Sequence, residues 1–313
     1  MKKIVFSLLS FLLFNCSCEK MASNPVVSPP VNTTPTTVVT TPPLATLNAN
    51  FEENPSVFPI EPHIIDEASG LCESRSMPGN LWVEQDSGNP NELYLLSNQG
   101  KYKGKITLNG TKNRDWEDIT IGEGPEMGKI YIYLADIGDN NADNHKSHIY
   151  RFVEPKNLQE EVSQIDKITY VYPDGSRDAE TILLDPATKD IYIVSKRESK
   201  VRLYQLPFPQ SITETITAKF ITELPFTYIT SGGISADGRE IMLKDYYAVF
   251  YWQRKEKESI IEALSRPNDK KLPYIQEPQG EGICFDKDGK GYFTISEIYN
   301  AASVNLYYYA RKK

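Results

Sequence analysis

The sequence is short of basic residues, and this shortage limits the partners that it can bind. Its 313 residues include 34 Lys and Arg against 42 Asp and Glu, which gives a net charge of −8. Broad nucleic-acid binding needs a basic face, so the composition argues against a nucleic-acid partner. The length allows one large domain or two ordinary ones.

Several common catalytic motifs are also missing. No Gly-x-Ser-x-Gly elbow occurs, which excludes the common serine-esterase fold. The stretch GEGPEMGKI (122–130) resembles a phosphate loop, but its spacing is one residue too long and Ile130 replaces the required Ser or Thr. His145 and His148 have no Cys or carboxylate partner at zinc-binding spacing, which favours an exposed loop.

The N-terminal apolar run is too short to cross a bilayer. It extends from Ile4 to Phe14 behind two lysines, which is typical of a secretory signal. Cys16 and Cys18 follow it and indicate a bacterial lipoprotein with acyl chains on one of them. Cys16 is preferred because Leu13 lies three residues earlier, whereas Cys18 has the small Ser17 directly before it.

We therefore expect residues 1–18 to be a lipoprotein signal segment. Residues 19–46 are rich in Pro, Thr, Ser and Val, cannot bury a core, and are expected to form a disordered tether. The globular domain then covers residues 47–313. These expectations place the protein in the bacterial cell envelope, extracytoplasmic and in contact with the membrane only through its lipid anchor.

Cysteine is scarce in the expected domain, which holds only Cys72 and Cys284. An extracytoplasmic compartment permits a disulfide, but two small buried thiols explain the pair better.

A short motif recurs about every 50 residues. The five copies are EASGL (67–71), DWEDI (115–119), DAETI (178–182), TSGGI (230–234) and QGEGI (279–283). Each is followed by a turn, a strand that ends in a polar cluster, a third strand and an outer strand. Regular short strands indicate a sandwich or barrel by default, but this period and order favour a β-propeller.

We therefore predict an all-β fold, a five-bladed β-propeller with four antiparallel strands per blade; six blades are the alternative. The single helical pattern, at 256–266, is interpreted as an insert in the outer part of the fourth blade. The last repeat ends at its third strand, NLYYYA (305–310). Its outer strand can come from residues 47–58, so the N-terminal strand would close the ring and remove open edges.

The repeated motif begins each innermost strand, so equivalent residues should meet near the channel axis. These residues are Ser69, Glu117, Glu180 and Glu281, and in the fourth copy Ser231, which lies one position before the aligned Gly232. Three converging glutamates cannot all stay ionised without a counter-charge. Calcium suits an irregular cage of oxygen ligands, so a calcium cofactor is expected here; a water-filled channel with hydrogen-bonded glutamates is the alternative.

A second polar set ends the second strand of each blade and should surround the same channel mouth. It comprises Asp86, Asp136, Lys196, Arg197, Lys244, Asp245 and Glu297. Mixed charges around a cation predict a site for an anionic ligand, with Lys and Arg holding its oxygens. The two aspartates Asp86 and Asp136 are the candidates for a catalytic base or water-positioning group. Solvated loop ends are the alternative interpretation.

Four segments resemble a widespread group of secreted bacterial β-propellers of unsettled function. They are NLWVEQDSGNPNELYLL (80–96), NRDWEDI (113–119), YLADIGDN (133–140) and IYRFVEP (149–155). The resemblance covers most of residues 65–300.

A more distant similarity is to the five-bladed calcium-activated nucleotidases (apyrases). It rests on the order Ser, Glu, Glu, Ser, Glu of the five axial residues and on GEGICF (280–285), and it implies that the five ligate one axial calcium. Where the apyrases have an acidic pair followed by Arg, this chain has QDSGN (85–89) and keeps only Asp86. Phytase-like and SdiA-regulated propellers also resemble it through acidic channel mouths.

The sequence thus predicts a monomeric, lipid-anchored propeller whose calcium-bound channel mouth binds an anionic small molecule or a surface glycan or protein. The alternative function is a calcium-dependent phosphoester hydrolase of the nucleotidase or phytase type.

The lipid anchor gives the first testable prediction. Labelled palmitate should be incorporated into the wild-type protein and lost from the Cys16→Ser/Cys18→Ser double variant, because acylation needs the thiol. The two single variants then show which cysteine carries the chains. Equal labelling of the wild type and the double variant would contradict the anchor.

Overall fold

The computed structural model describes residues 48–162 and 164–313, which belong to one compact unit. The expected signal segment, Cys16, Cys18 and the tether lie outside the described residues. Within the described part, no helix is long and apolar enough to span a membrane.

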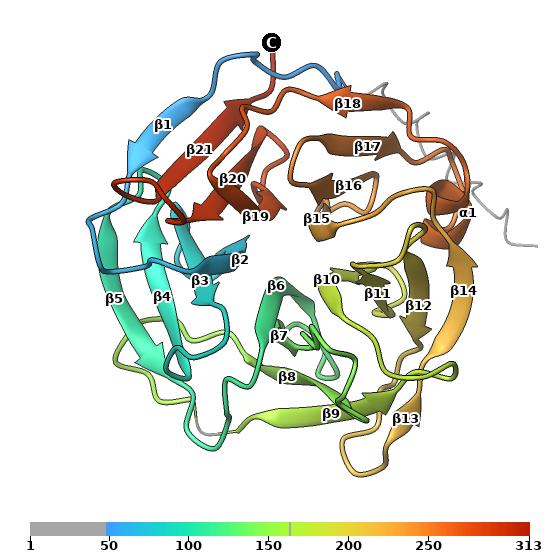
Figure 1. Ribbon diagram of the computed structural model, residues 1–313. Coiled ribbons are helices and arrows are strands. Elements are labelled where there is room, and N and C mark those ends of the chain that lie inside the picture. The colour runs from blue at the N-terminus through green and yellow to red at the C-terminus, as the bar shows by residue number, and fades with distance from the viewer. Residues whose placement is uncertain (1–47, 163) are drawn as a thin grey trace, which may run out of the picture. The chain divides into compact units, whose positions relative to one another are not determined.

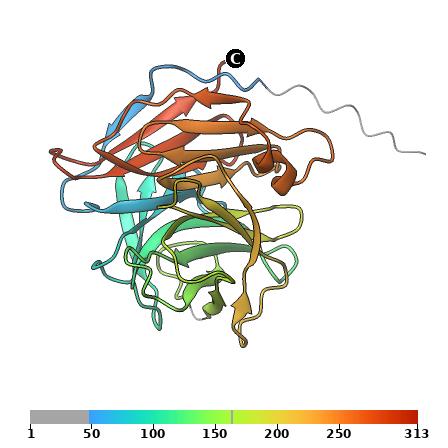
Figure 2. The same ribbon diagram turned by 45° about the vertical axis from the view of Figure 1, so that its right-hand side comes forward.

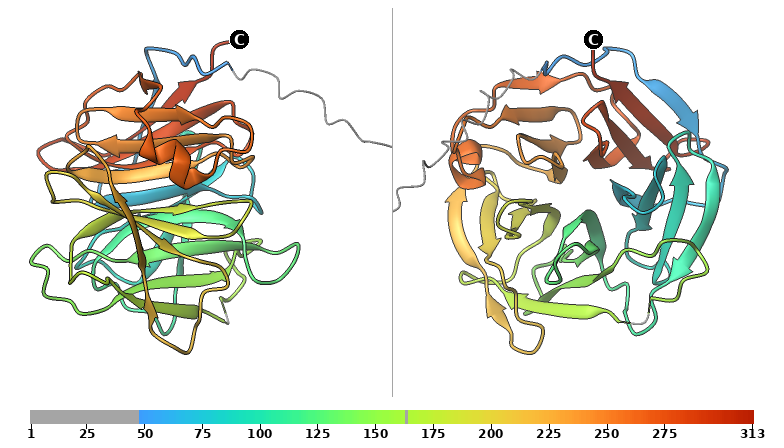
Figure 3. Two further views of the ribbon diagram at one scale, coloured as in Figure 1. Left: turned by 90° about the vertical axis from the view of Figure 1, so that its right-hand side faces the viewer. Right: turned by 180° about the vertical axis from the view of Figure 1, so that it is seen from behind.

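Five small sheets surround a common centre, as Figure 1 and the view from behind in Figure 3 show. In each blade, strands that follow one another along the chain pair antiparallel from the centre outward. The first blade comprises β2 (Ala68–Glu73), β3 (Asn80–Gln85), β4 (Glu92–Ser97) and β5 (Tyr102–Thr107). The second comprises β6 (Trp116–Glu123), β7 (Ile130–Asp136), β8 (Ser147–Val153) and β9 (Asp166–Val171), with the short β13 (Ile216–Thr217) parallel to β9.

The remaining three blades follow the same order. The third comprises β10 (Ala179–Leu184), β11 (Ile191–Ser195), β12 (Arg202–Leu206) and β14 (Lys219–Glu223). The fourth comprises β15 (Ile229–Ile234), β16 (Glu240–Asp245), β17 (Val249–Gln253) and β18 (Lys270–Leu272). The fifth comprises β19 (Gln279–Phe285), β20 (Gly291–Glu297), β21 (Asn305–Ala310) and β1 (Ser56–Pro59). The prediction of five four-stranded antiparallel blades is confirmed.

The helix α1 (Ile260–Ser265) lies between β17 and β18, at the outer side of the fourth blade (Figure 2). Ser259 caps its N-terminus in a capping box with Glu262, which satisfies two otherwise unpaired backbone N–H groups. Its buried side chains pack against the third and fourth blades.

Apolar side chains form five clusters, one between each pair of neighbouring blades. Successive residues of a strand point to opposite faces. Ile182 therefore packs toward the second blade, whereas Leu183 packs toward the fourth. This arrangement explains why second strands such as β7 and β11 are nearly continuous apolar runs rather than alternating ones. Cys72 and Cys284 are free and buried, and they belong to different clusters.

The N-terminal strand β1 forms the outer edge of the fifth blade beside β21 (blue and red in Figure 1). Its register runs from Ser56 opposite Tyr308 to Pro59 opposite Asn305. Just before it, the ring of Phe51 lies 4.9 Å from that of Tyr292, between the fourth and fifth blades. Whether this segment is what holds the ring closed stays a prediction.

Two truncations test that prediction. Deletion of residues 19–44 should leave the melting temperature unchanged, because a tether contributes no packing. Deletion of residues 19–60 removes β1 and the buried Phe51, and loss of a buried Phe side chain alone costs about 3–5 kcal/mol. At roughly 2 °C per kcal/mol for a domain of this size, we expect a fall of at least about 6 °C by calorimetry. Equal melting of both truncations would show that the segment does not close the ring.

Candidate metal centre

The two polar sets predicted from the sequence lie at the same end of the inner hairpins. Antiparallel pairing sets the start of each innermost strand against the end of the second strand. The register pairs are Ala68 with Gln85, Trp116 with Asp136, Ala179 with Ser195, Ile229 with Asp245, and Gln279 with Glu297. The motif residues and the polar strand ends therefore surround one mouth of the channel.

Both predicted serine ligands connect innermost strands of different blades. The Ser69 hydroxyl donates to the backbone carbonyl of Glu117 over 2.9 Å. The Ser231 hydroxyl donates to the Asp118 carboxylate over 3.2 Å and accepts a bond from the N–H of Ile283. Their assignment as calcium ligands stays a prediction.

Asp118 is a buried carboxylate that the sequence interpretation missed. It accepts bonds from the N–H groups of Ile119 and Ile182 in addition to the Ser231 hydroxyl. It thereby connects the innermost strands of the second, third and fourth blades. Its position directly after Glu117 on an innermost strand was a signal, and a register shift in the pairing of β6 with β7 between Trp116 and Asp118 interrupts the regular alternation of side chains here.

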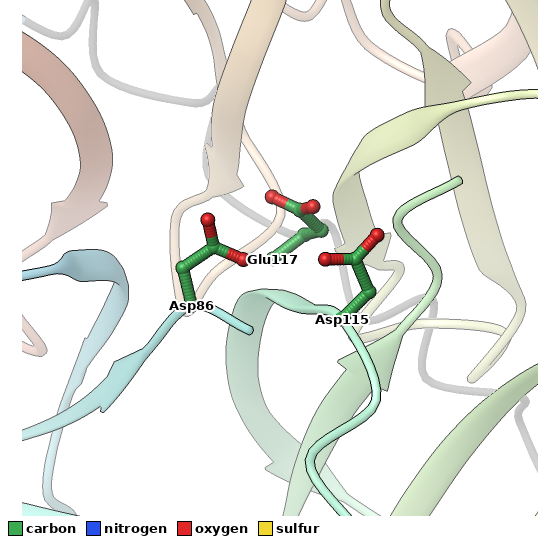
Figure 4. A group of neighbouring side chains, drawn as sticks. All are labelled: Asp86, Asp115 and Glu117. Atoms are coloured by element: carbon green, nitrogen blue, oxygen red, sulfur yellow. The ribbon is translucent and has the colours of Figure 1, made fainter. Parts of the chain in front are cut away.

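Three carboxylates converge at the rim of the mouth: Asp86, which follows β3, Asp115, which precedes β6, and Glu117 on β6 (Figure 4). One oxygen from each lies within 4.8 Å of the other two. We call this group the rim triad. Asp115 was not among the predicted site residues, although the DWEDI and DAETI motifs both begin with Asp and so offered a signal.

Asn113 brings the two blades of the rim triad together. Its side-chain amide donates to the carbonyls of Gln85 and Asp86, both over 2.9 Å, at the end of β3. Its side-chain oxygen accepts a bond from the N–H of Trp116 at the start of β6. The position of Asp86 relative to β6 is therefore fixed by hydrogen bonds across the blade interface.

Hydrogen bonds at the end of β7 hold the backbone of the rim triad in place. Asp136 is 2% exposed, and its carboxylate accepts a bond of 3.0 Å from the backbone N–H of Asp115. The Arg114 guanidinium donates to the carbonyl of Asp136 over 2.9 Å. The structure thus places Asp136 under the backbone of Asp115 rather than beside the other carboxylates of the mouth, in a positioning role.

Gly138 makes room for two of the three carboxylates. A Cβ atom at this position would lie 2.1 Å from Oε1 of Glu117 and 2.5 Å from Cγ of Asp115. Real Cβ contacts are not this short, so a side chain here would displace the carboxylates. The two acidic motifs, NRDWEDI and YLADIGDN, are therefore parts of one construction: the first supplies the carboxylates and the second supports and accommodates them.

A second group, the inner triad, shares Glu117 and adds Asp178 and Glu180. Basic side chains already compensate it: Lys196 forms a salt bridge with Glu180, and Nε of Arg197 lies 2.5 Å from Asp178. In the described residues, no Lys or Arg forms a salt bridge with a carboxylate of the rim triad. The rim triad is therefore a group of converging carboxylates without a basic partner in the described residues.

The electrostatics of the rim triad follow from this imbalance. Burial, with the neighbouring carboxylates, raises the pKa of Asp86 to about 6. Burial and like charges also raise the pKa of Asp115 and, more strongly, that of Glu117. Without a counter-charge, such a group takes up protons near neutral pH.

The other predicted ligand-binding residues have different environments. Lys244 is fully buried, donates to the Gly280 carbonyl, and lies 5.0 Å from the ring centre of Tyr274. Asp245 caps the following turn by accepting bonds from two backbone N–H groups. Burial and nearby acids raise the pKa of the half-buried Glu297 to about 8. Arg197 is exposed at the mouth.

Comparison with known proteins adds little to this geometry. No family model matches the chain, and no curated protein matches it. A solved structure described as the Dos1 propeller is similar over 78% of this chain and 68% of its own, at 12% identity and a TM-score of 0.37. That score carries no inference about function, and the propeller architecture rests on the sheet topology.

Gly138→Ala tests the construction of the rim. The added methyl group overlaps two carboxylates, and overpacking of this kind costs typically 1–3 kcal/mol, so chemical denaturation should show a loss in that range. The control is Gly233→Ala on β15, where an added Cβ meets only ordinary contacts at 3.8 Å or more. Equal stability of the two variants would show that Gly138 is not needed to accommodate the carboxylates.

Proposed function

We propose that the rim triad binds one divalent cation, with calcium the best-matched ion, and that this cation forms part of a binding site for an anionic ligand. The observation that carries the proposal is that the carboxylate of Glu117 is buried without a bonding partner in the described residues. Its side chain is 5% exposed, and no hydrogen bond or salt bridge to its carboxylate occurs in the described part of the chain. It faces the carboxylates of Asp86 and Asp115 instead.

Charge repulsion explains why a cation fits here. Two unit charges within 4.8 Å repel by at least about 3 kcal/mol at the effective dielectric constant of a protein surface. Three such pairs, together with burial, make the fully ionised triad unfavourable. A divalent cation turns these repulsions into attractions.

The donor set favours calcium over other ions. All three side chains offer carboxylate oxygens, which suit Ca²⁺, Mg²⁺ and Mn²⁺, and the triad includes no imidazole or thiolate of the kind that zinc and copper sites use. Magnesium demands near-ideal octahedral geometry, whereas calcium accepts six to eight oxygens in irregular arrangements. Three carboxylates from two blades leave ligand positions for water or for an oxygen of a bound molecule.

Features beside the triad support an anionic ligand. The exposed Arg197 lies at the same mouth, and a guanidinium holds carboxylate or phosphate oxygens in a defined geometry. A cavity of about 230 Å³ next to it is lined by Arg177 and Arg197 together with the acids Asp139, Asp178 and Glu198, so the cavity itself contributes no net positive charge. The bound cation and Arg197 would hold the ligand. A small carboxylate or phosphate compound, or an acidic group of a surface glycan or protein, matches this chemistry. The expected anchor at residues 1–18 would present the site in the cell envelope.

Calcium-dependent phosphoester hydrolysis is the second candidate function. It is favoured by the position of Asp86 at the rim, where a carboxylate beside the bound cation would orient a water molecule for attack on phosphorus. The exposed Arg197 would then neutralise phosphate oxygens, and the cation would polarise the phosphoryl group. Phosphate release from a panel of nucleotides and phosphate esters, with calcium and with chelator, separates this activity from ligand binding alone.

Calcium should raise the melting temperature of the purified protein. A ligand at a hundredfold excess over its Kd stabilises the folded state by about 2.7 kcal/mol, which corresponds to roughly 5 °C here. Asp115→Asn removes one charge of the triad, so its calcium response should fall by at least half while its stability in chelator rises. The matched control, Asp288→Asn, changes an exposed acid that pairs with Lys287 and Lys290, and it should respond to calcium as the wild type does.

The calcium effect should also grow with pH. The folded state, with the raised pKa of Asp86, binds more protons than the unfolded chain, so metal-free stability falls as the pH rises from about 4 through 6 and above. Calcium should therefore stabilise more at pH 8 than at pH 5.5. An unchanged melting temperature with calcium at pH 8, and no metal found by elemental analysis, would contradict the proposed function.

A further inference from the structure

Three buried glutamates face the channel axis from three different blades: Glu117 on β6, Glu180 on β10 and Glu281 on β19. We call them the axial glutamates. One oxygen of Glu281, Oε2, is buried and has no hydrogen-bond partner in the described structure. The carboxylate of Glu117 is likewise unpaired. These three side chains would be expected to need a shared counter-charge.

Lys196, directly after β11, provides that charge. Its side chain is 6% exposed, its ammonium forms a salt bridge with Glu180, and Nζ lies 5.3 Å from the ring centre of Tyr246. The positive charge of Lys196 acts to lower the pKa of all three axial glutamates, against the larger effect of burial. Glu180 and Glu281 in turn raise the pKa of Lys196, so the ammonium stays charged.

The backbone holds Lys196 in this position. Its N–H donates to the carbonyl of Asp178 over 3.1 Å, just before β10. Its carbonyl accepts a bond of 2.7 Å from the N–H of Tyr228, just before β15. The residue is therefore fixed between the starts of two innermost strands, which directs its side chain to the axis. A surface salt bridge would not be constrained from both sides in this way.

We infer that the inner triad, Glu117, Asp178 and Glu180, is a second cation position, which the ammonium of Lys196 fills through its salt bridge with Glu180. The folded protein then binds one divalent cation, at the rim triad, and none at the inner triad. The number one rests on the proposed function, whereas the filling of the inner triad by Lys196 does not. Lys196 is in this sense a specificity-determining residue, because its identity decides how many cations the mouth accepts.

The test compares calcium stoichiometry by equilibrium dialysis and calorimetry, with calcium alone as the probe. Wild type should bind one ion. Lys196→Met keeps the length of the side chain and removes its charge, so this variant should bind two ions. The Lys196→Met/Glu180→Gln double variant lacks a charge of the inner triad and should return to one. Lys105→Met, which removes a surface partner of Glu92, is the control and should also bind one.

Melting temperatures give an independent measurement. Lys196→Met leaves buried carboxylates without their counter-charge, so it should melt below wild type in chelator and recover in calcium. The double variant should melt above Lys196→Met in chelator, because it carries one fewer unpaired charge. A structural salt bridge alone would give the loss of stability without recovery in calcium.

Each remaining outcome has a defined meaning. No additional calcium bound by Lys196→Met, or a Lys196→Met protein that does not fold even in calcium, would overturn the inference. Two ions bound by wild type would overturn it as well, because Lys196 would then exclude nothing. If wild type binds no ion and Lys196→Met binds one, the proposed function fails and the role of Lys196 stands.

Discussion

Most of this structure depends on one constraint, the burial of both faces of every inner strand between neighbouring blades. The apolar side chains of these strands enter one of two interfaces between blades. A buried polar side chain is costly unless it finds a partner. The acidic starts of the innermost strands and the polar ends of the second strands meet at one mouth of the channel.

The carboxylates at the mouth form two groups that differ in whether basic side chains balance their charge. The inner triad is balanced from within by Lys196 and Arg197, whereas the rim triad has no basic partner in the described structure. A protein that needed only neutral packing here could have used amides in place of Asp86, Asp115 and Glu117. The backbone around them is instead fixed by Asn113, Asp136 and Gly138. This support holds like charges close together, and such an arrangement is stable only with protons or a cation.

The sequence predicted the fold well and the site in part, and particular residues show why. Blade number and strand order followed from repetition, because each blade repeats the same hairpin chemistry. The convergence of the two polar sets followed from antiparallel pairing. The role of Asp136 was not predictable, because only the register of β6 and β7 shows that its carboxylate lies under the N–H of Asp115. The pairing of Lys196 with Glu180 depends on side-chain direction, which the repeat alignment does not encode.

The pairing of β1 with β21 has a consequence for how the chain folds. Ser56 is made long before its partner Tyr308. The fifth blade joins segments that lie far apart in the sequence, so its contacts are among those with the greatest sequence separation in the described structure. Closing so long a loop is entropically costly and slow. Until the C-terminal strand arrives, four blades can assemble as an open arc whose edges are exposed to other chains.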